Sequence, residues 1–410
     1  MSGGIVVSQM GARMHYAVPR ILNEAGLLER LYTDICAVQG FPRLLKSLPR
    51  RAQPKALRRL LGRVPVGIPP QAIRSFPTMG ALQVMERMRL KNPADETVLV
   101  LAEARAFSRA VVRRGFCGAT GFYGIAGECL EQLRAARAKG LWTAVEQIIA
   151  PRDIVESLVA AEATRFPAWG QTAFDPHAWA FGKRERNEWD VADLIVCPSE
   201  FVRAAVIAEG GPAEKCVVVP YGIDPERFRA PVRAHDGPLR VLTVGAIGLR
   251  KGSPYVVEAA RRLLATAEFR MVGGIGVDRG LLEAPNLTLL GQIPRAEIAA
   301  QFAWADVFLL PSACEGSATV TYEALAAGLP LIVTPNTGSV VEDGVSGIVV
   351  PLGDIEAIVA ALRCLDEDRD KLAMMSAAAV ERGNHFDLDA YGRRLLEALA
   401  PLRRTREPVQ

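Results

Sequence analysis

The stretch CEGSATVTYEALAAG, residues 314–328, lies between two short apolar runs, residues 307–311 and residues 331–333. This order predicts a strand, a loop that contains glycine, a helix and a second strand. Glu315 belongs to the loop, and Glu323 follows about two turns along the helix. The sequence therefore predicts two carboxylates, one on each side of a helix N-terminus.

The start of this helix is suited to an anion. Gly316, Ser317 and Thr319 stand where free backbone N–H groups and the positive end of the helix dipole favour negative charge. The two flanking carboxylates can accept hydrogen bonds from hydroxyl groups. We expect a ligand with a phosphate in the middle and hydroxyls at both ends, and a nucleotide sugar is such a ligand.

Length and composition indicate how many domains to expect and which classes of protein are disfavoured. A chain of 410 residues is long for one hydrophobic core, so two domains are expected, and a net charge of +4 gives no reason to expect nucleic acid. The seven cysteines are scattered and never spaced as C-x-x-C, which predicts neither a disulfide framework nor a zinc site. The sequence shows no apolar leader and no apolar run of roughly 20 residues. We expect a cytoplasmic protein, at most peripheral to the inner face of the membrane.

Strands and helices alternate through both halves of the chain, which indicates parallel βαβ units. A segment at about residues 222–238 is rich in Pro, Gly, Arg and Asp and is typical of a linker. The expected fold class is α/β, with two Rossmann-like, doubly wound domains facing across a cleft. Residues 1–222 form the first domain, and residues 239–385 form the second.

Two places in the first domain could face the cleft. Gly11 follows the first strand and could let the backbone approach a phosphate, although a simple turn is the alternative; His15 would face the same side. Glu146, Gln147 and Arg152 stand at or just after the end of a later strand, where ligands of such sheets bind. Gly11 is a candidate for the donor side, and His15, Glu146, Gln147 and Arg152 are the candidates for the acceptor side.

Residues 43–63 carry eight basic side chains interleaved with leucines, and no acidic residue occurs between Asp34 and Glu86. Such a segment can lie on an anionic membrane surface. The four prolines in and next to it favour a solvated loop with short helices instead, and both alternatives stay open. The run at residues 183–188 mixes charges of both signs and predicts a solvated helix face.

A second loop provides positive charge. Gly245 follows a strand, and Arg250 and Lys251 end the loop before the next helix. In a doubly wound domain this loop opens on the same edge as the loop of Glu315. Two cations there would hold a pyrophosphate and neutralise the charge of a leaving diphosphate. Lys251, Arg250 and Glu315 are therefore the predicted catalytic residues.

These motifs resemble those of retaining glycosyltransferases of family 4. The stretch from Glu315 to Glu323 is similar to that family's motif of two glutamates separated by seven residues, and residues 244–252 are similar to its diphosphate loop. Residues 192–199, 218–224 and 338–351 resemble three further markers. The resemblance covers about residues 190–400 and implies a GT-B fold, in which residues 386–410 cross back to the first domain. It also implies a mechanism that needs no metal or other cofactor and retains the anomeric configuration.

The resemblance also implies roles for single residues. Lys251 would hold the diphosphate of the donor, and Glu323 its ribose. Glu315 would hold the transferred sugar together with Gly316 and Ser317. Val320 and Thr321 would contact phosphate, and the backbone near Gln292 and Ile293 would meet the base.

Three positions depart from the family pattern. Ala246 replaces an arginine that many members have in the diphosphate loop, so Arg250 could supply the second charge. Gln147 stands where many members have a histidine and cannot act as a base; Glu146, His15 or the leaving phosphate are the alternatives. Ser317 and Ala318 replace an aromatic residue and a small one in the sugar pocket.

The sequence thus predicts transfer of a sugar from a nucleoside-diphosphate sugar to a hydroxyl of a glycan, a lipid-linked saccharide or a small metabolite. The alternatives are a nucleotide-sugar epimerase or hydrolase and a noncatalytic nucleotide-sugar-binding subunit. A nicotinamide enzyme is disfavoured because no G-x-G-x-x-G follows a strand. The base, the sugar, the acceptor and the oligomeric state are left open.

Overall fold

The computed structural model describes residues 3–49, 51, 53–90, 95–170, 175–229 and 237–404. Parts of three predicted segments lie outside these residues: Arg50 and Ala52 of the basic segment, residues 230–236 of the linker, and residues 405–410 of the final segment. The side chains of Lys55 and Ala56 are likewise outside the description. Among the described helices, none has the length and apolar content needed to cross a bilayer.

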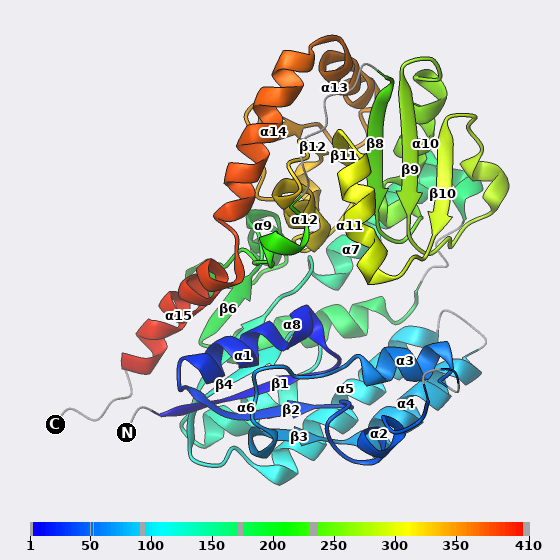
Figure 1. Ribbon diagram of the computed structural model, residues 1–410. Helices are drawn as coiled ribbons and strands as arrows, with labels where there is room; N and C mark the ends of the chain where they lie inside the picture. The colour runs from blue at the N-terminus through cyan, green and yellow to red at the C-terminus, as the bar shows by residue number, and fades with distance from the viewer. Residues whose placement is uncertain are drawn as a thin grey trace.

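The first half of the chain forms a seven-stranded parallel sheet with the strand order β3-β2-β1-β4-β5-β6-β7 (Figure 1). Its strands are β1 (Gly4–Gln9), β2 (Leu28–Thr33), β3 (Ile73–Ser75), β4 (Ala119–Ile125), β5 (Trp142–Glu146), β6 (Leu194–Cys197) and β7 (Cys216–Val218). Its helices are α1 (Ala17–Glu24), α2 (Phe41–Leu45), α3 (Lys55–Leu61), α4 (Pro77–Arg89), α5 (Glu96–Arg114), α6 (Leu130–Ala138), α7 (Arg152–Arg165), α8 (Ala178–Val191) and α9 (Glu200–Ala208). Strand order reverses between β1 and β4.

The second half forms a six-stranded parallel sheet with the order β10-β9-β8-β11-β12-β13. Its strands are β8 (Leu239–Val244), β9 (Ala267–Val272), β10 (Leu287–Gly291), β11 (Val307–Leu310), β12 (Leu331–Val333) and β13 (Gly347–Val349). Its helices are α10 (Ser253–Arg262), α11 (Arg295–Trp304), α12 (Thr319–Ala326), α13 (Ile355–Glu367), α14 (Arg369–Asn384) and α15 (Leu388–Arg404). Strand order reverses between β8 and β11. The predicted pair of doubly wound α/β units is confirmed.

The last helix returns to the first sheet (Figure 1). Tyr391 of α15 packs edge to face on Tyr221, with 5.9 Å between the ring centroids. Leu395 and Leu399 are fully buried in one apolar cluster with Val18 and Ile21 of α1. Burial of these apolar side chains holds α15 on the N-terminal unit, because the apolar face of α15 packs against α1.

The mixed-charge run at residues 183–188 is not a solvated face, and that prediction is wrong. Arg184, Glu185 and Glu188 on α8 are all buried. Glu188 accepts hydrogen bonds from the backbone N–H groups of Gly127 and Cys129, and Glu185 accepts one from the N–H of Arg152. These carboxylates are buried because they satisfy backbone donors of neighbouring loops, which a sequence pattern does not reveal. Burial raises the pKa of Glu188 to about 8 and that of Glu185 to about 7.

The loop after β8 lies very close to the end of β11. A Cβ at Gly252 would be 1.9 Å from the carbonyl oxygen of Pro311, and Gly252 has a φ of +67°. Only glycine fits this position, since both the space and the backbone angle exclude a side chain. This close approach brings together the loop after β8 and the loop after β11, at the place where the strand order of the second sheet reverses.

We expect Gly252→Ala to lower the free energy of unfolding by about 2–4 kcal/mol, through the clash and the left-handed backbone. The matched control is Gly248→Ala in the same loop, where the backbone is extended and no atom lies within 4 Å of the added Cβ. This control should change the stability by less than about 0.5 kcal/mol. Urea denaturation measures both variants, and equal stabilities of the two would contradict the expectation.

Candidate active site

Three charged side chains meet at the carboxyl ends of β8 and β11. Arg250 and Lys251 belong to a 3-10 turn, η8 (Leu249–Lys251), that ends the loop after β8, and Glu315 lies in the loop after β11. The Oε1 atom of Glu315 is 2.6 Å from Nη1 of Arg250 and 2.9 Å from Nζ of Lys251. The structure therefore brings together the three residues predicted to be catalytic, at the point where the strand order reverses.

The backbone holds this group in place. The N–H of Ala313 donates to the carbonyl of Arg250 at 2.9 Å, so the two loops are joined directly. Gly245 lets the Lys251 side chain pass close by, since a Cβ there would be 2.9 Å from Cε of Lys251. Burial lowers the pKa of Lys251, and the Glu315 carboxylate opposes that shift. A buried cation next to a carboxylate is suited to bind phosphate oxygens.

The residues at the start of α12 divide into two kinds. Thr319 lines a pocket, and Val320 is half-buried and packs on the core. The hydroxyl of Ser317 donates to the carbonyl of Gly338 at 2.9 Å and lies 2.6 Å from the hydroxyl of Tyr322, while that of Thr321 donates to the carbonyl of Ala318. The hydroxyls of Ser317 and Thr321 are thus already engaged by the protein.

Gly316 is one of the points where the two halves of the molecule touch. A Cβ at Gly316 would be 1.8 Å from the carbonyl oxygen of Ile148, which follows β5. The carbonyl of Gly316 accepts a hydrogen bond of 2.5 Å from the hydroxyl of Ser199, the N-cap residue of α9. The loop of Glu315 therefore faces the N-terminal sheet directly.

Glu323 lies in a pocket of about 380 Å³ between the two halves, here named the interdomain pocket. The pocket is lined by Met14, His15, Arg20, Gly222, Ile223, Asp224, Arg227, Phe228, Arg295, Thr319, Glu323 and Leu388. Burial raises the pKa of Glu323 to about 7, although Arg295 and Arg227 oppose the shift. The side chain is placed to accept hydrogen bonds from ligand hydroxyls.

The residues predicted to meet the base lie beside this region. Gln292 is exposed at the end of β10, and its amide nitrogen would be 3.1 Å from a Cβ at Gly274. Ile293 is half-buried and packs on the core. Both precede α11, the helix that begins with Arg295 of the interdomain pocket.

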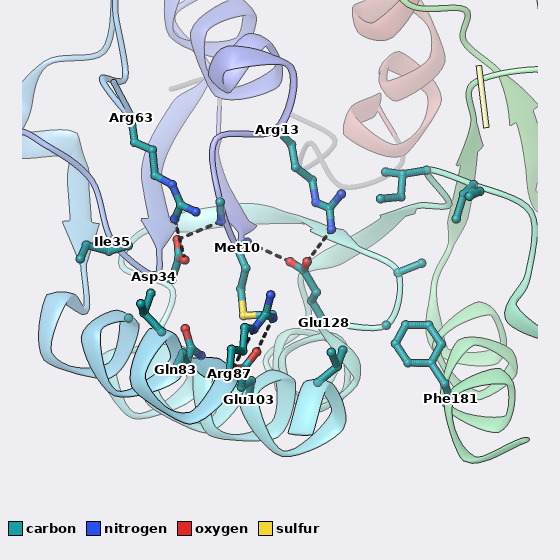
Figure 2. A pocket seen from close by; sticks show the side chains of 18 of the residues that line it. Met10, Arg13, Asp34, Ile35, Arg63, Gln83, Arg87, Glu103, Glu128 and Phe181 are labelled. Carbon is teal, nitrogen blue, oxygen red and sulfur yellow. Dashed lines mark hydrogen bonds and ion pairs between the residues drawn. The ribbon is translucent and has the colours of Figure 1, made fainter. Parts of the chain in front are cut away.

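A second pocket of about 310 Å³, here named the N-terminal pocket, lies at the carboxyl ends of β1, β2, β4 and β5 (Figure 2). Charged pairs surround it. Glu128 accepts from Nη2 of Arg13 at 2.9 Å, Asp34 from Nη1 of Arg63 at 3.2 Å, and Glu103 from Arg87 through both of its oxygens. Glu185, Gln147, Ile148, Ile149, Met10, Gly11 and Phe181 are among its other lining residues.

The loop between β1 and α1 separates the two pockets. Met10, Gly11 and Arg13 line the N-terminal pocket, whereas Met14 and His15 line the interdomain pocket. The N–H of Gly11 donates to Asp34, and the N–H of Met10 donates to Glu128. Met14, His15 and Tyr16 have positive φ angles of 44°, 52° and 62°. Three successive strained residues that lack the freedom of glycine indicate that the surrounding structure holds this loop in a required position.

The predicted acceptor-side residues are spread over different environments. His15 contacts Arg295 across the cleft, and burial together with Arg295 lowers its pKa. Glu146 is buried, and its two oxygens accept from the hydroxyls of Tyr123 and Tyr221. Gln147 lines the N-terminal pocket and bonds to Glu185 and Trp189. Arg152 pairs with Glu156 and Asp175.

Gly11, which was predicted on the donor side, lines the N-terminal pocket, and its donor role stays a prediction. Arg13, Asp34, Glu128 and Arg295 were not among the predicted site residues. Asp34 and Glu128 follow β2 and β4, so applying the rule that ligands bind at strand ends to every strand would have found them. In the described part of the chain, no group of three or more His, Cys, Asp or Glu side chains is placed to hold a metal ion.

Comparison with known proteins agrees with this geometry. Residues 238–368 match the family model described as Glycosyl transferases group 1. The chain is similar to the amylovoran biosynthesis glycosyltransferase AmsK of Erwinia amylovora, with 32% identity over 51% of this chain and 56% of that protein. It is equally similar to the putative colanic acid biosynthesis glycosyltransferase WcaL of Escherichia coli, with 32% identity over 51% of this chain and 57% of that protein. The matches thus span little more than half the length of these relatives.

Two solved structures share the whole architecture. HepE of Anabaena, in complex with UDP and glucose, aligns with a TM-score of 0.61 and 16% identity over 97% of this chain and 100% of that one. Sucrose-phosphate synthase of Thermosynechococcus elongatus aligns with a TM-score of 0.67 and 15% identity, over 98% of this chain and 100% of that one. The expected GT-B fold is confirmed, and the match to group 1 glycosyltransferases confirms the resemblance to glycosyltransferases. Membership of family 4 stays a prediction.

The raised pKa of Glu323 predicts a pH-dependent stability. Its folded-state pKa of about 7 exceeds the ordinary value of 4.5, so the folded protein binds a proton that the unfolded chain releases between these values. This stabilisation is fully present below about pH 4.5 and is lost as the pH rises through 7. Relative to Glu323→Gln, the wild type should lose on the order of 2 kcal/mol of unfolding free energy between about pH 5 and 8.

Chemical denaturation at a series of pH values measures this difference. Glu297→Gln, at an exposed position of α11, controls for the loss of a negative charge. Parallel stability curves of the wild type and Glu323→Gln would contradict the assignment.

Proposed function

We propose that this protein is a retaining glycosyltransferase that moves a sugar from a nucleoside-diphosphate sugar to a hydroxyl of a glycan, a lipid-linked saccharide or a small metabolite. The observation that carries the proposal is the contact of Glu315 with both Arg250 and Lys251 beside the N-terminus of α12. The match to group 1 glycosyltransferases supports it, as does the UDP complex of HepE. The names of AmsK and WcaL favour a role in polysaccharide biosynthesis.

The donor side follows from the chemistry of the group. The bond between the anomeric carbon and the oxygen of the β-phosphate breaks, and the bonding electrons go to the leaving diphosphate. Arg250, Lys251 and the backbone N–H groups at the start of α12 stabilise that negative charge. Because these cations can neutralise the leaving group, we infer a reaction that requires no metal ion or other cofactor.

The carboxylates of Glu315 and Glu323 bind the two sugars of the donor. Diphosphate oxygens can replace the Glu315 carboxylate on the two cations, which leaves Glu315 able to accept from a hydroxyl of the transferred sugar. Glu323 accepts from the ribose in the interdomain pocket. Gln292 and Ile293, at the end of β10, lie where the base extends from the ribose.

The acceptor side is assigned to the N-terminal pocket. Ile148 and Ile149 line this pocket and approach Gly316 in the neighbouring loop, so an acceptor hydroxyl here can reach the donor sugar. Glu146 is an unsuitable base, because both of its oxygens are engaged by buried tyrosines. We infer that the leaving phosphate takes the acceptor proton while the new glycosidic bond forms on the same face of the sugar.

Lys251→Ala and Glu315→Gln should each lower kcat by about 100-fold or more, because charge stabilisation in a buried site contributes that much. Lys183→Ala, at an exposed position of α8, is the matched control and should retain activity. The measurement is release of nucleoside diphosphate with a panel of saccharide and lipid-linked acceptors, with circular dichroism as the check on folding. Near-normal turnover by both variants would overturn the site.

The same assay separates the alternatives. An epimerase or hydrolase would consume the donor without a product on any acceptor. A noncatalytic subunit would bind the donor without turnover.

Glu323→Ala should weaken donor binding about tenfold, since a hydrogen bond from the ribose to a charged group contributes roughly 1.5–3 kcal/mol. The probes are UDP-glucose, GDP-mannose and ADP-glucose, screened first by thermal shift and then by calorimetry with the one that binds. Glu297→Ala on α11 is the control. Unchanged donor affinity in Glu323→Ala would remove the ribose role.

A further inference from the structure

Helices α2, α3 and α4 gather at one end of the N-terminal unit (Figure 1). A Cβ at Gly40, the residue before α2, would be 2.6 Å from Pro77, the first residue of α4. Arg63, just after α3, lines the N-terminal pocket together with Gln83 and Arg87 of α4. The three helices therefore border one continuous region, and their exposed side chains, with those of Leu48 and Val66, are here named the α2–α4 surface.

This surface is unusually apolar. Eight of the thirteen large apolar side chains that are exposed among the described residues lie between residues 41 and 88. They are Phe41, Leu44, Leu48, Val66, Leu82, Val84, Met85 and Met88. Leu44 is 74% exposed and Met88 is 82% exposed, so neither is packed in the core. Clustering of this kind marks an interaction site.

The apolar side chains of α4 share one face. Leu82, Met85 and Met88 follow each other at a spacing of three residues, which places them on one side of the helix. Gln83, Val84 and Arg87 line the N-terminal pocket from the same helix. Helix α4 thus lies between that pocket and the exposed apolar face.

The charge of the surface has one predominant sign. Its exposed basic side chains include Arg43, Lys46, Arg58, Arg59 and Arg89. Glu86, exposed on α4, is the one acidic side chain among the described residues of this surface, because the sequence has no acidic residue between Asp34 and Glu86. A second copy of the chain would present the same positive charges, so two such surfaces repel each other. The partner that fits both the charge and the apolar side chains is negatively charged and apolar beneath.

We propose that the α2–α4 surface docks this protein on an anionic lipid bilayer. The arginines and lysine are attracted by the headgroups, and Leu44, Met85 and Met88 enter the boundary between headgroups and acyl chains. Docking would place α4, and the N-terminal pocket behind it, next to the lipid surface. It favours a lipid-linked saccharide among the proposed acceptors, a step that rests on the proposed function.

Vesicle cosedimentation of the full chain, without donor or acceptor, tests the docking separately from catalysis. The protein should bind vesicles of phosphatidylglycerol and phosphatidylcholine, and should bind vesicles of phosphatidylcholine alone much more weakly. Binding should fall between about 0.05 M and about 0.5 M salt, because salt screens the attraction. The double variant Arg58→Glu/Arg59→Glu should lower the partition coefficient by more than about tenfold.

Arg363→Glu/Arg393→Glu is the matched control, since it reverses two exposed arginines on α13 and α15, outside the α2–α4 surface. It should bind the mixed vesicles as the wild type does. A second variant, Leu44→Ser/Met88→Ser, should weaken binding at high salt, where the apolar contribution remains. Absence of binding by the folded wild type, or equal loss in the arginine control, would overturn the proposal. So would self-association in light scattering that the Leu44→Ser/Met88→Ser variant abolishes.

Discussion

The reversal of strand order in each sheet is the constraint on which the site depends. Where neighbouring parallel strands send their connections to opposite faces of the sheet, the loops at their carboxyl ends part and leave a crevice. In the C-terminal sheet this occurs between β8 and β11, and Arg250, Lys251 and Glu315 stand there. In the N-terminal sheet it occurs between β1 and β4, where Arg13 meets Glu128. The close approach of Gly316 to Ile148 makes the two crevices neighbours.

Charge pairing explains how such a site can exist before a ligand arrives. Burying two cations without a carboxylate partner has a desolvation free energy that would strongly destabilise the fold. The Glu315 carboxylate pairs with both Arg250 and Lys251, and in the N-terminal pocket Arg13, Arg63 and Arg87 each have a carboxylate. Under the proposed function, a donor diphosphate would take over the cations of the first group. The single carboxylate of Glu315 thus offsets part of the charge of the two cations before a ligand binds, and one net positive charge remains for the ligand.

Sequence patterns predicted the features that depend on residues close together along the chain. The alternation of apolar strands and amphipathic helices predicted two doubly wound sheets, and the two loops with Lys251 and Glu315 could be paired because both follow strands of one sheet. Local patterns failed where burial depends on distant partners. Residues 183–188 looked solvated, yet Glu185 and Glu188 are buried because they bind backbone N–H groups of residues 127, 129 and 152. The exposed apolar face of α4 had no sequence signal either, because the period of a helix does not tell which side is covered.

The sequence by itself determined the parallel architecture and the composition of the donor loops, because strand period, helix period and turn residues are set by neighbours along the chain. Only the tertiary structure decided what these loops face. It showed that Glu315 is shared by two cations, that Glu323 lies in a pocket built from both halves, and that the loop after β1 divides this pocket from a second one. It also showed that the two oxygens of Glu146 accept hydrogen bonds from Tyr123 and from Tyr221, which lies 75 residues farther along the chain. Residues so far apart in sequence meet through tertiary packing, and the period of a strand or helix does not tell which distant residue a side chain contacts.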